Sequence, residues 1–586
     1  MVSFLAMATR GGPVHVVTTS RTYKGQVYTT HLLRRSYREG DKVRNETLGN
    51  LSHLPVAVID LVRQALKGEA FVAASSAFEI LSSRPHGHVQ AVIAAMRRLG
   101  FEALIGSRPS RERDLVCAMV AARVLAPHTK LATTRWWHTT TLADEFAVSE
   151  ADEDELYAAM DWLLARQGVI EKKLAARQLS DGGLVLYDLS SSYFEGSCCP
   201  LAKLGHNRDG KKGKLQVNYG LLTDARGCPV AVSVFEGNTA DCETLLGQVE
   251  RVRDEFAIDT MVIVGDRGMI SQKSIEQLRK LEGVAWITAM KSAQIRPLIE
   301  EGSLQLGLFD ERSLFEFTHP EFPGERLVAC RNPELAKRRA HKRQALIEAT
   351  VVELDQVRAM VGRVGRKRLS GRDKIGLRVG RVVNKYKVAK HFEVTIEENH
   401  LAFHVREDEV AKEAALDGIY VLRTPLLVEQ MDVAQVVRSY KSLSTVERAF
   451  RSLKTVDLKV RPIHHRLADR VCAHIFLCML AYYVEWHMCE AWRSMLFADE
   501  DLNAKAQRDP VAPAKRSAIA EHKAHTHTLP DGSAAHSFRT LIEELATIVR
   551  NTCRTRDAAE APTFPLITQA SPTQRRALDL LETIRV

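Results

Sequence analysis

Tyr440-Lys-Ser-Leu-Ser-Thr-Val-Glu447-Arg-Ala-Phe-Arg-Ser-Leu-Lys454 has the spacing of an amphipathic helix. At about 100° per residue, side chains seven positions apart fall on nearly one line along a helix. Tyr440, Glu447 and Lys454 therefore share one stripe, and an apolar stripe lies roughly 80° from it, made of Leu443, Val446, Phe450 and Leu453. Glu447 is expected at the rim of a buried face, between a phenol and an ammonium group. A solvated edge residue shows the same pattern, so upstream residues must decide between the two interpretations.

The composition is that of a globular protein with several domains. At 586 residues the chain exceeds the ~250–300 residues over which a single core usually grows. It is 45% hydrophobic and 26% charged, which are ordinary values for a soluble chain. Lysine and arginine outnumber the acids by 82 to 72, and the net charge of +10 favours a polyanionic partner such as nucleic acid.

The cysteines and histidines predict no closed metal site and no redox motif. The ten cysteines form no Cys-x-x-Cys pair. The group of Cys472, His464, His465 and His474 lacks the spacing of a closed site, and reduced thiols are typical of a cytosolic protein. The longest apolar run, residues 471–484, is interrupted by His474 and is too short for a membrane span. It is predicted to be a buried core helix, and no membrane is expected as a partner.

The periodicity predicts a mixed α/β chain with five regions. The first two are a β-meander at 1–54 and a helical region at 55–180. An α/β core at 181–290 resumes at 431–492 after a β-rich insertion at 291–430, whose predicted strands include 382–388. The last is a helical and loop region at 493–586, with helices at 538–551 and 572–584. Basic residues of the meander either follow DNA phosphates or are simply solvated, whereas the basic face of the helical region is typical of DNA-binding bundles.

Two acids follow apolar runs of the predicted core. The order of elements from residue 184 to 289 is βββαβαβ, and Asp188 and Asp266 each come at the end of such a run. Strand ends in a mixed sheet project side chains into a common crevice, and Glu447 supplies a third carboxylate. Three converging carboxylates repel one another unless a cation lies between them. Oxygen ligands of this kind suit two Mg²⁺ or Mn²⁺ ions, which together activate a phosphodiester for in-line displacement.

These residues carry a resemblance to a known family. Asp188 in Leu-Tyr-Asp-Leu-Ser-Ser-Ser, Asp266 in Val-Gly-Asp-Arg-Gly-Met and the stretch from Tyr440 to Lys454 resemble the DDE transposases of bacterial insertion sequences. The likeness is to the IS-four-type superfamily, in the branch with a Tyr-Arg-Glu-Lys signature and a β-rich insertion before the Glu. Further stretches agree, at 205–222, 236–241 and 417–424. One departure is Leu443, which stands at the position of the signature Arg.

The resemblance implies an RNase H-like catalytic core whose metal ligands are Asp188, Asp266 and Glu447. It implies two Mg²⁺ or Mn²⁺ ions, hydrolysis of the inverted-repeat ends of a DNA element, and attack of the freed 3′-hydroxyl on target DNA. It also implies a homodimer when the ends are synapsed, in the bacterial cytoplasm at the nucleoid.

The same resemblance suggests DNA contacts around the cut. Tyr440 and Lys454 would bind phosphates. The phosphate contact that an arginine would make at position 443 is either absent or made by one of Lys441, Arg448 and Arg451. Arg267 binds phosphate or pairs with a neighbouring acid. A glycine-flanked basic loop either follows a DNA strand or is solvated, and it carries Lys211, Lys212 and Lys214.

Two rival functions remain at this stage. The first is a metal-dependent nuclease of the same fold that cuts DNA without joining it, and the second is a catalytically inactive DNA-binding remnant. Ser190, Ser191 and Ser192 suggest no serine nucleophile, because the chain has no Gly-x-Ser-x-Gly elbow with a paired histidine.

Overall fold

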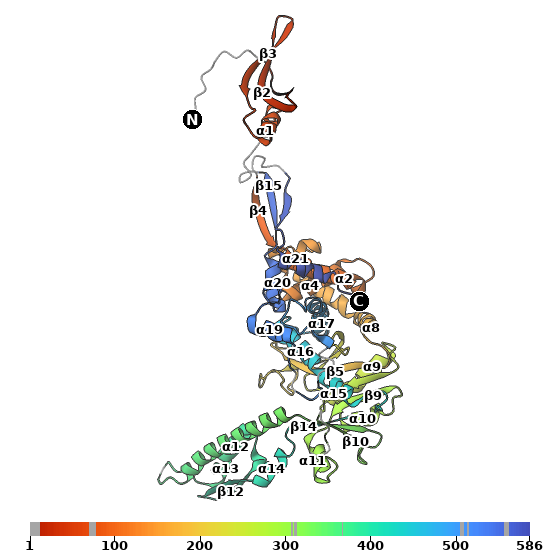
Figure 1. Ribbon diagram of the computed structural model, residues 1–586. Helices are drawn as coiled ribbons and strands as arrows, with labels where there is room; N and C mark the ends of the chain where they lie inside the picture. The colour runs from red at the N-terminus through yellow and green to blue at the C-terminus, as the bar shows by residue number, and fades with distance from the viewer. Residues whose placement is uncertain are drawn as a thin grey trace. The chain divides into compact units, whose positions relative to one another are not determined.

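The computed structural model describes residues 12–69, 78–305, 309, 313–365, 367–503, 509–512, 515–555 and 562–585. The chain divides into two compact units (Figure 1). The first comprises residues 1–83 and 551–566, and the second comprises residues 84–550 and 567–586. The second unit contains all the candidate catalytic residues.

The first unit contains the predicted meander. Strands β1 (Val14–Tyr23), β2 (Gln26–Glu39) and β3 (Lys42–Asn50) pair antiparallel in that order, and helix α1 (Val56–Leu66) follows. Both hairpin turns contain a glycine with positive φ, Gly25 and Gly40. A separate small sheet has the order β16-β15-β4 and consists of β16 (Phe564–Ile567), β15 (Val549–Thr555) and β4 (Phe78–Pro85).

The C-terminal region differs from its prediction at one helix. The helix expected over 538–551 ends earlier, as α20 (Phe538–Ala546), and the residues after it enter β15. The pattern Val549-Arg-Asn-Thr-Cys-Arg-Thr alternates and includes β-branched residues, which is typical of a strand. The helix expected over 572–584 is confirmed as α21 (Pro572–Leu581).

Helices of the second unit surround one long buried helix. Helix α17 (Ala468–Ala491) contacts α4 (Arg111–Leu125) and α7 (Glu153–Leu164). Its length and hydropathy would suit a membrane span, but 94% of its apolar window is buried inside the protein, as expected for a core helix. The remaining helices of this layer are α2 (Gly87–Arg98), α3 (Phe101–Ile105), α5 (Lys130–Trp136), α6 (Leu142–Glu145), α8 (Gln167–Gln178) and α19 (Ala518–Thr526).

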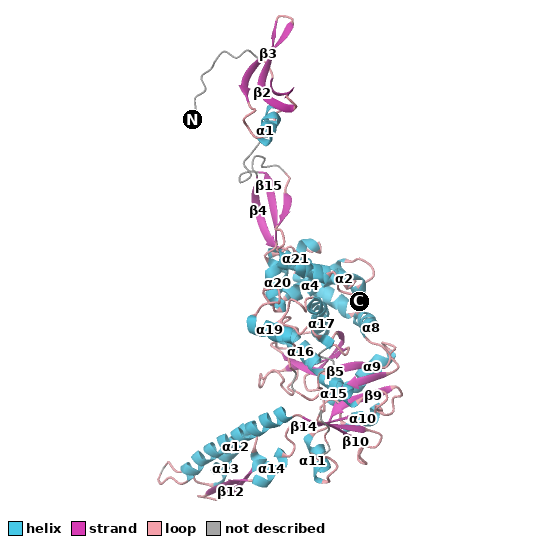
Figure 2. Cartoon of the chain, viewed as in Figure 1, coloured by secondary structure: helices cyan, strands magenta, loops and turns pink. Residues whose placement is uncertain are grey.

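The central sheet has the strand order β10-β11-β14-β9-β8-β5-β6-β7 among the described residues (Figure 2). The predicted core strands are confirmed as β5 (Gly183–Tyr193), β6 (Gln216–Thr223), β7 (Pro229–Glu236), β8 (Met261–Val264) and β9 (Val284–Ala289). Strand β5 pairs antiparallel with β6 and parallel with β8, which in turn pairs parallel with β9. Helix α9 (Asp241–Asp254) connects β7 to β8, and helix α10 (Gln272–Leu278) provides the crossover from β8 to β9.

Alternate residues of β5 serve two cores, because successive side chains of a strand point to opposite faces. Val185 and Tyr187 pack with residues of α9 and α10 in one cluster, and Leu186 belongs to the other cluster with residues of α17. Covering both faces accounts for the continuous apolar runs that the sequence shows in this region.

The insertion is a mixture of helices and strands rather than a β-rich subdomain. Three of its strands, β10 (Leu314–Phe317), β11 (Arg326–Arg331) and β14 (Ile419–Thr424), extend the central sheet. The rest, preceded by α11 (Ser292–Glu300), comprises α12 (Pro333–Val361), α13 (Arg372–Tyr386), the hairpin β12 (Phe392–Ile396) and β13 (Leu401–Val405), and α14 (Glu407–Ala414). Figure 1 shows α12 and α13 side by side.

The strand predicted at 382–388 is wrong, since most of this segment lies in α13. Ile375, Val379 and Val382 recur at helical spacing and are buried in one apolar cluster with residues of α12. The β-branched residues favour a strand locally, but packing against α12 outweighs that preference.

Candidate active site

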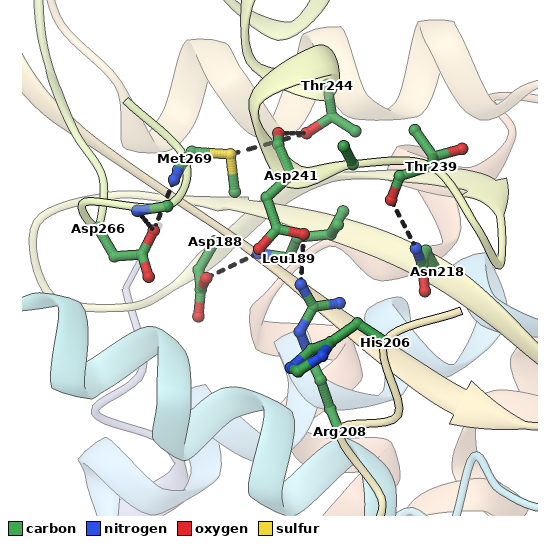
Figure 3. Close-up of polar contacts among 12 residues, drawn as sticks. Asp188, Leu189, His206, Arg208, Asn218, Thr239, Asp241, Thr244, Asp266 and Met269 are labelled. Carbon is green, nitrogen blue, oxygen red and sulfur yellow. Dashed lines mark hydrogen bonds and ion pairs between the residues drawn. The ribbon is translucent and has the colours of Figure 1, made fainter. Parts of the chain in front are cut away.

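Asp188 lies in β5, and Asp266 follows the end of the neighbouring parallel strand β8. Leu186 of β5 is paired with Val264 of β8, and each aspartate follows its member of this pair by two residues. The two aspartates are therefore at equivalent positions along the neighbouring segments of chain. Asp188 does not end its strand as expected, because β5 continues to Tyr193, whereas β8 ends at Val264. The shorter partner strand leaves Asp188 open on the side toward Asp266 (Figure 3).

Backbone N–H groups fix both carboxylates. Oδ1 of Asp266 accepts hydrogen bonds from the N–H groups of Gly268 at 2.9 Å and Met269 at 2.7 Å. Oδ1 of Asp188 accepts one from the N–H of Leu189 at 2.8 Å (Figure 3). A Cβ at Gly268 would lie 3.3 Å from Oδ1 of Asp266, so the turn leaves little room for a side chain there. In each carboxylate one oxygen is held by the backbone, which orients the group.

Glu447 comes from helix α16 (Leu443–Arg451), which packs on β5. Val446, Ala449 and Phe450 are buried, whereas Glu447 is exposed. The ring of Phe450 meets that of Tyr219 in β6 edge to face, with centroids 5.8 Å apart. The apolar stripe predicted from the sequence therefore anchors α16 against the sheet, and Glu447 stands at its rim as expected.

The stretch from Tyr440 to Lys454 is not one regular helix. Tyr440 belongs to α15 (Val433–Lys441), the hydrogen-bonding pattern is interrupted at Ser442, and α16 passes into a π-helical turn at Ser452–Val456. Asp432 caps α15, accepting from the N–H of Gln435 at 2.7 Å. Single π turns in helices occur frequently at functional sites, and this one rotates Lys454 away from the line that a continuous helix would give.

The three acids act on one another electrostatically. Burial, together with the carboxylates of Asp266 and Glu447, raises the pKa of Asp188 to about 7, against a lowering by the N–H of Leu189 and the guanidinium of Arg208. Burial and the same acids also raise the pKa of Tyr440 to about 12. The phenol of Tyr440 and the three carboxylates therefore lie near enough to influence one another electrostatically.

The donor set suits a hard divalent cation, although the geometry is not that of a closed site. Within the described ranges, no three His, Cys, Asp or Glu side chains lie close enough together to hold a metal ion. Asp188 comes from β5, Asp266 from just after the end of β8 beside it, and Glu447 from α16, which packs on β5. Carboxylate oxygens are the ligands that magnesium and manganese prefer. A bound cation would also relieve the mutual repulsion of the carboxylates.

Lys454 is buried in an ion-pair cluster. Its Nζ lies 3.1 Å from Oδ1 of Asp209, which also pairs with Arg461. Oδ2 of Asp209 accepts a hydrogen bond from the N–H of Tyr193, the last residue of β5. Asp209 and Arg461 were not recognised from the sequence as part of the site, although Asp209 lies in one of the stretches that carried the resemblance. A second such pair, Arg208 with Asp241, lies beside Asp188 (Figure 3).

The other predicted DNA contacts lie on the surface. The exposed set comprises Lys441, Arg448, Arg451, Arg267, Lys211, Lys212 and Lys214. Lys214 lies 3.7 Å from Glu195, and Nζ of Lys211 is 5.8 Å from the ring centroid of Tyr193 at the end of β5. Arg267 is close enough to Tyr440 to lower the pKa of its phenol. Their contact with DNA stays a prediction.

Comparison with known protein families gives two matches. The model described as the transposase DDE domain matches residues 191–484, half of the chain. This chain belongs to the DDE transposase family. The match contains Asp266 and Glu447 and begins just after Asp188. A second model, the N-terminal domain of IS1634 family transposases, matches residues 16–76 of the transposase.

Other comparisons add little to the family match. No curated protein matches the transposase. A solved structure titled "Cryo-EM structure of piggyBac transposase synaptic complex with hairpin DNA (SNHP)" is similar over 78% of this chain and 77% of that one, with 9% identity and a TM-score of 0.33. That likeness is too weak to decide the fold. The enzyme class is therefore established by the family match.

Proposed function

We propose that this transposase cuts the inverted-repeat ends of its DNA element and joins the freed 3′-hydroxyl to target DNA. Asp188, Asp266 and Glu447 are the proposed catalytic residues. The observation that carries the proposal is the register of β5 and β8, which sets the two aspartates side by side, with Glu447 near enough to raise the pKa of Asp188.

The same three carboxylates are the proposed ligands of two Mg²⁺ or Mn²⁺ ions. Such ions polarise a phosphodiester and stabilise both its attacking and leaving oxygens. The chain's own part is orientation. The N–H groups of Leu189, Gly268 and Met269 hold one oxygen of each aspartate, and the contact of Phe450 with Tyr219 fixes the helix that carries Glu447.

The reaction has two balanced steps. In the first, water attacks a phosphorus at the element's end, and the P–O3′ bond breaks to leave a 3′-hydroxyl on one strand. In the second, that hydroxyl attacks a phosphorus of the target strand, so one P–O3′ bond forms and one target P–O3′ bond breaks. Each proton lost by an attacking oxygen is balanced by one gained at the leaving oxygen.

DNA would lie across the mouth of this site. Tyr440, half-buried beside the acids, and the exposed cations Arg267, Arg448 and Arg451 are placed to contact phosphates. Leu443 is half-buried and packs against the core, which supports the view that no phosphate is bound from the signature Arg position. Lys454, paired with Asp209, acts by positioning rather than by binding DNA.

Finer features of the family resemblance complete the proposal. The order β7-β6-β5-β8-β9, with β5, β8 and β9 parallel, supports an RNase H-like core. The spacing from Tyr440 to Lys454 supports the Tyr-Arg-Glu-Lys branch of the IS-four-type superfamily. The working form would be a homodimer on paired ends, in the bacterial cytoplasm at the nucleoid.

The test uses DNA that carries the element's ends together with a target plasmid and Mg²⁺. The proposal predicts cleaved ends and then joined product, visible as a labelled end that becomes covalently linked to the plasmid. Cleavage without joining would show a nuclease, and DNA binding without cleavage would show an inactive remnant. Glu429→Gln is a matched control, because Glu429 is an exposed carboxylate shortly before α15, and it should leave both steps unchanged.

A further inference from the structure

A basic cavity lies apart from the three acids, between the helical layer and the segment that follows the π-helical turn. Its volume is about 890 Å³. It is lined by the end of α4, the start of α5, Tyr157 of α7, the segment 459–467 and the first turns of α17. All these segments belong to the second unit.

The charge of the lining has one sign only. Ten of its seventeen residues are Lys, Arg or His, and none is Asp or Glu. The six lysine and arginine side chains are Arg123, Lys130, Lys459, Arg461, Arg466 and Arg470. A cavity with cations on every side and no acid in its wall concentrates positive potential where solvent is partly excluded.

Two of these cations are buried at the base of the cavity. Lys130 is 5% exposed and Arg123 is 7% exposed. Arg123 donates to the carbonyl oxygens of His128 at 3.1 Å and Leu458 at 3.4 Å. For Nζ of Lys130, the described part of the chain provides no hydrogen bond or ion pair. A largely desolvated cation without a partner is unfavourable, and because Nζ of Lys130 is not among the atoms fully closed off from solvent, an anion that enters the cavity can reach it.

The titratable neighbours show the same excess of positive charge. Burial, helped by Arg123, lowers the pKa of Lys130 to about 7. Burial and then Lys130, Arg123 and Arg470 lower the pKa of His465 to about 3. His474 is buried, its pKa is lowered by burial and by His465, Arg123 and Lys130, and its Nδ1 has no partner in the described structure. A bound anion would offset the repulsion among these positively charged and basic groups.

The rim is accessible and carries further donors. Lys459, His464 and Arg466 are exposed, whereas Arg461 extends from the lining to Asp209 and thereby to the end of β5. A tetrahedral oxyanion accepts several charge-assisted hydrogen bonds at once and matches a cluster of Lys and Arg. We propose that this cavity binds a phosphate group, carried either by a DNA strand or by a free phosphate compound.

The first arm of the test uses inorganic pyrophosphate and the full-length protein. Melting temperatures are measured with pyrophosphate and with sodium chloride at matched ionic strength. Wild type should melt higher with pyrophosphate, by mass action on the folded state. Lys130→Met should melt higher than wild type in chloride, because a buried unpaired charge is gone, and its affinity for pyrophosphate should fall at least tenfold.

Two further variants keep this arm decisive. Arg466→Gln changes an exposed rim residue, so it tests the cavity even if Lys130→Met does not fold. Arg135→Gln is the matched control, because Arg135 is exposed on the same helix α5 and does not line the cavity. It should keep the wild-type affinity for pyrophosphate.

The second arm distinguishes the two phosphate sources. Binding of a duplex of unrelated sequence is measured against salt concentration, without divalent metal, so the result is independent of catalysis. If a DNA phosphate occupies the cavity, the slope of log K against log salt should fall by about 1 in Arg466→Gln and in Lys130→Met. Loss of the pyrophosphate effect with an unchanged slope would show a free phosphate compound instead. If neither variant alters pyrophosphate binding or the DNA slope, the proposal is overturned, whereas the proposed transposition chemistry is untouched.

Discussion

Nζ of Lys454 lies 3.1 Å from Oδ1 of Asp209, and the two side chains are only 10% and 3% exposed. The pair joins the π-helical turn after Glu447 to the loop between β5 and β6, and Asp209 also accepts a hydrogen bond from the N–H of Tyr193 at the end of β5. The carboxylate of Asp209 thus connects the helix that carries Glu447 to the strand that carries Asp188. Lys454, the last residue of the stretch that begins at Tyr440, therefore links these two elements through a buried ion pair.

Removing Asp209 should destabilise the transposase strongly. Asp209→Ala leaves the ammonium of Lys454 buried without its partner, and breaking a buried pair in this way costs about 3–5 kcal/mol. Chemical denaturation measures the change. The double variant Asp209→Ala with Lys454→Met should recover a large part of the loss, because the orphaned charge is gone. A loss below about 1 kcal/mol in the single variant would show that the pair is not structural.

Exposed arginines of α16 should behave differently from Lys454. Arg448→Gln and Arg451→Gln should leave the melting temperature unchanged and weaken DNA binding. Each should reduce the salt slope of binding by about 1, since each removes one phosphate contact. Lys280→Gln, after α10 on the opposite face of the sheet, is the matched control and should not change the slope. Unaltered slopes in both α16 variants would remove these residues from the DNA interface.

The raised pKa of Asp188 predicts a pH-dependent stability in the absence of metal. Its folded-state pKa of about 7 lies above the unfolded value of about 3.9. Between these pH values the folded state holds a proton that the unfolded state has released, so the free energy of unfolding falls as pH rises through this window. Above this window the full penalty remains, on the order of 4 kcal/mol, because each pKa unit corresponds to about 1.4 kcal/mol.

Asp188→Asn should remove this dependence. In a chelating buffer the variant should be more stable than wild type at about pH 8 and similar at about pH 4, the two sides of the titration window, as measured by denaturation at several pH values. Mg²⁺ should stabilise wild type on the alkaline side and have little effect on the variant. Asp254→Asn, an exposed aspartate at the end of α9, is the control. Parallel stability curves for wild type and Asp188→Asn would contradict the account of this carboxylate.

Local patterns in the sequence were sufficient to predict the core strands and the rim position of Glu447. The apolar runs before Asp188 and Asp266 predicted two buried strands, and the apolar stripe of α16 placed Glu447 at a rim, because burial on fixed faces leaves a periodic signal.

Interactions between distant segments could not be predicted in this way. Lys454 and Asp209 are 245 residues apart, and no periodicity shows that they meet. The interruption at Ser442 and the π turn at Ser452–Val456 depend on how hydrogen bonds shift along a helix, which the side-chain pattern does not show. Packing between α12 and α13 likewise decided the helix at 382–386 against its local β preference.

The most direct test of the central claim is strand joining by Glu447→Gln. Wild type, Glu447→Gln and the control Glu429→Gln are compared on DNA that carries the element's ends, with Mg²⁺ and a target plasmid, after DNA binding has been shown to be equal. We predict that Glu447→Gln loses end cleavage and joining by at least about 10²-fold, while the control retains both. Joining at the wild-type rate by Glu447→Gln would contradict the assignment of the three acids.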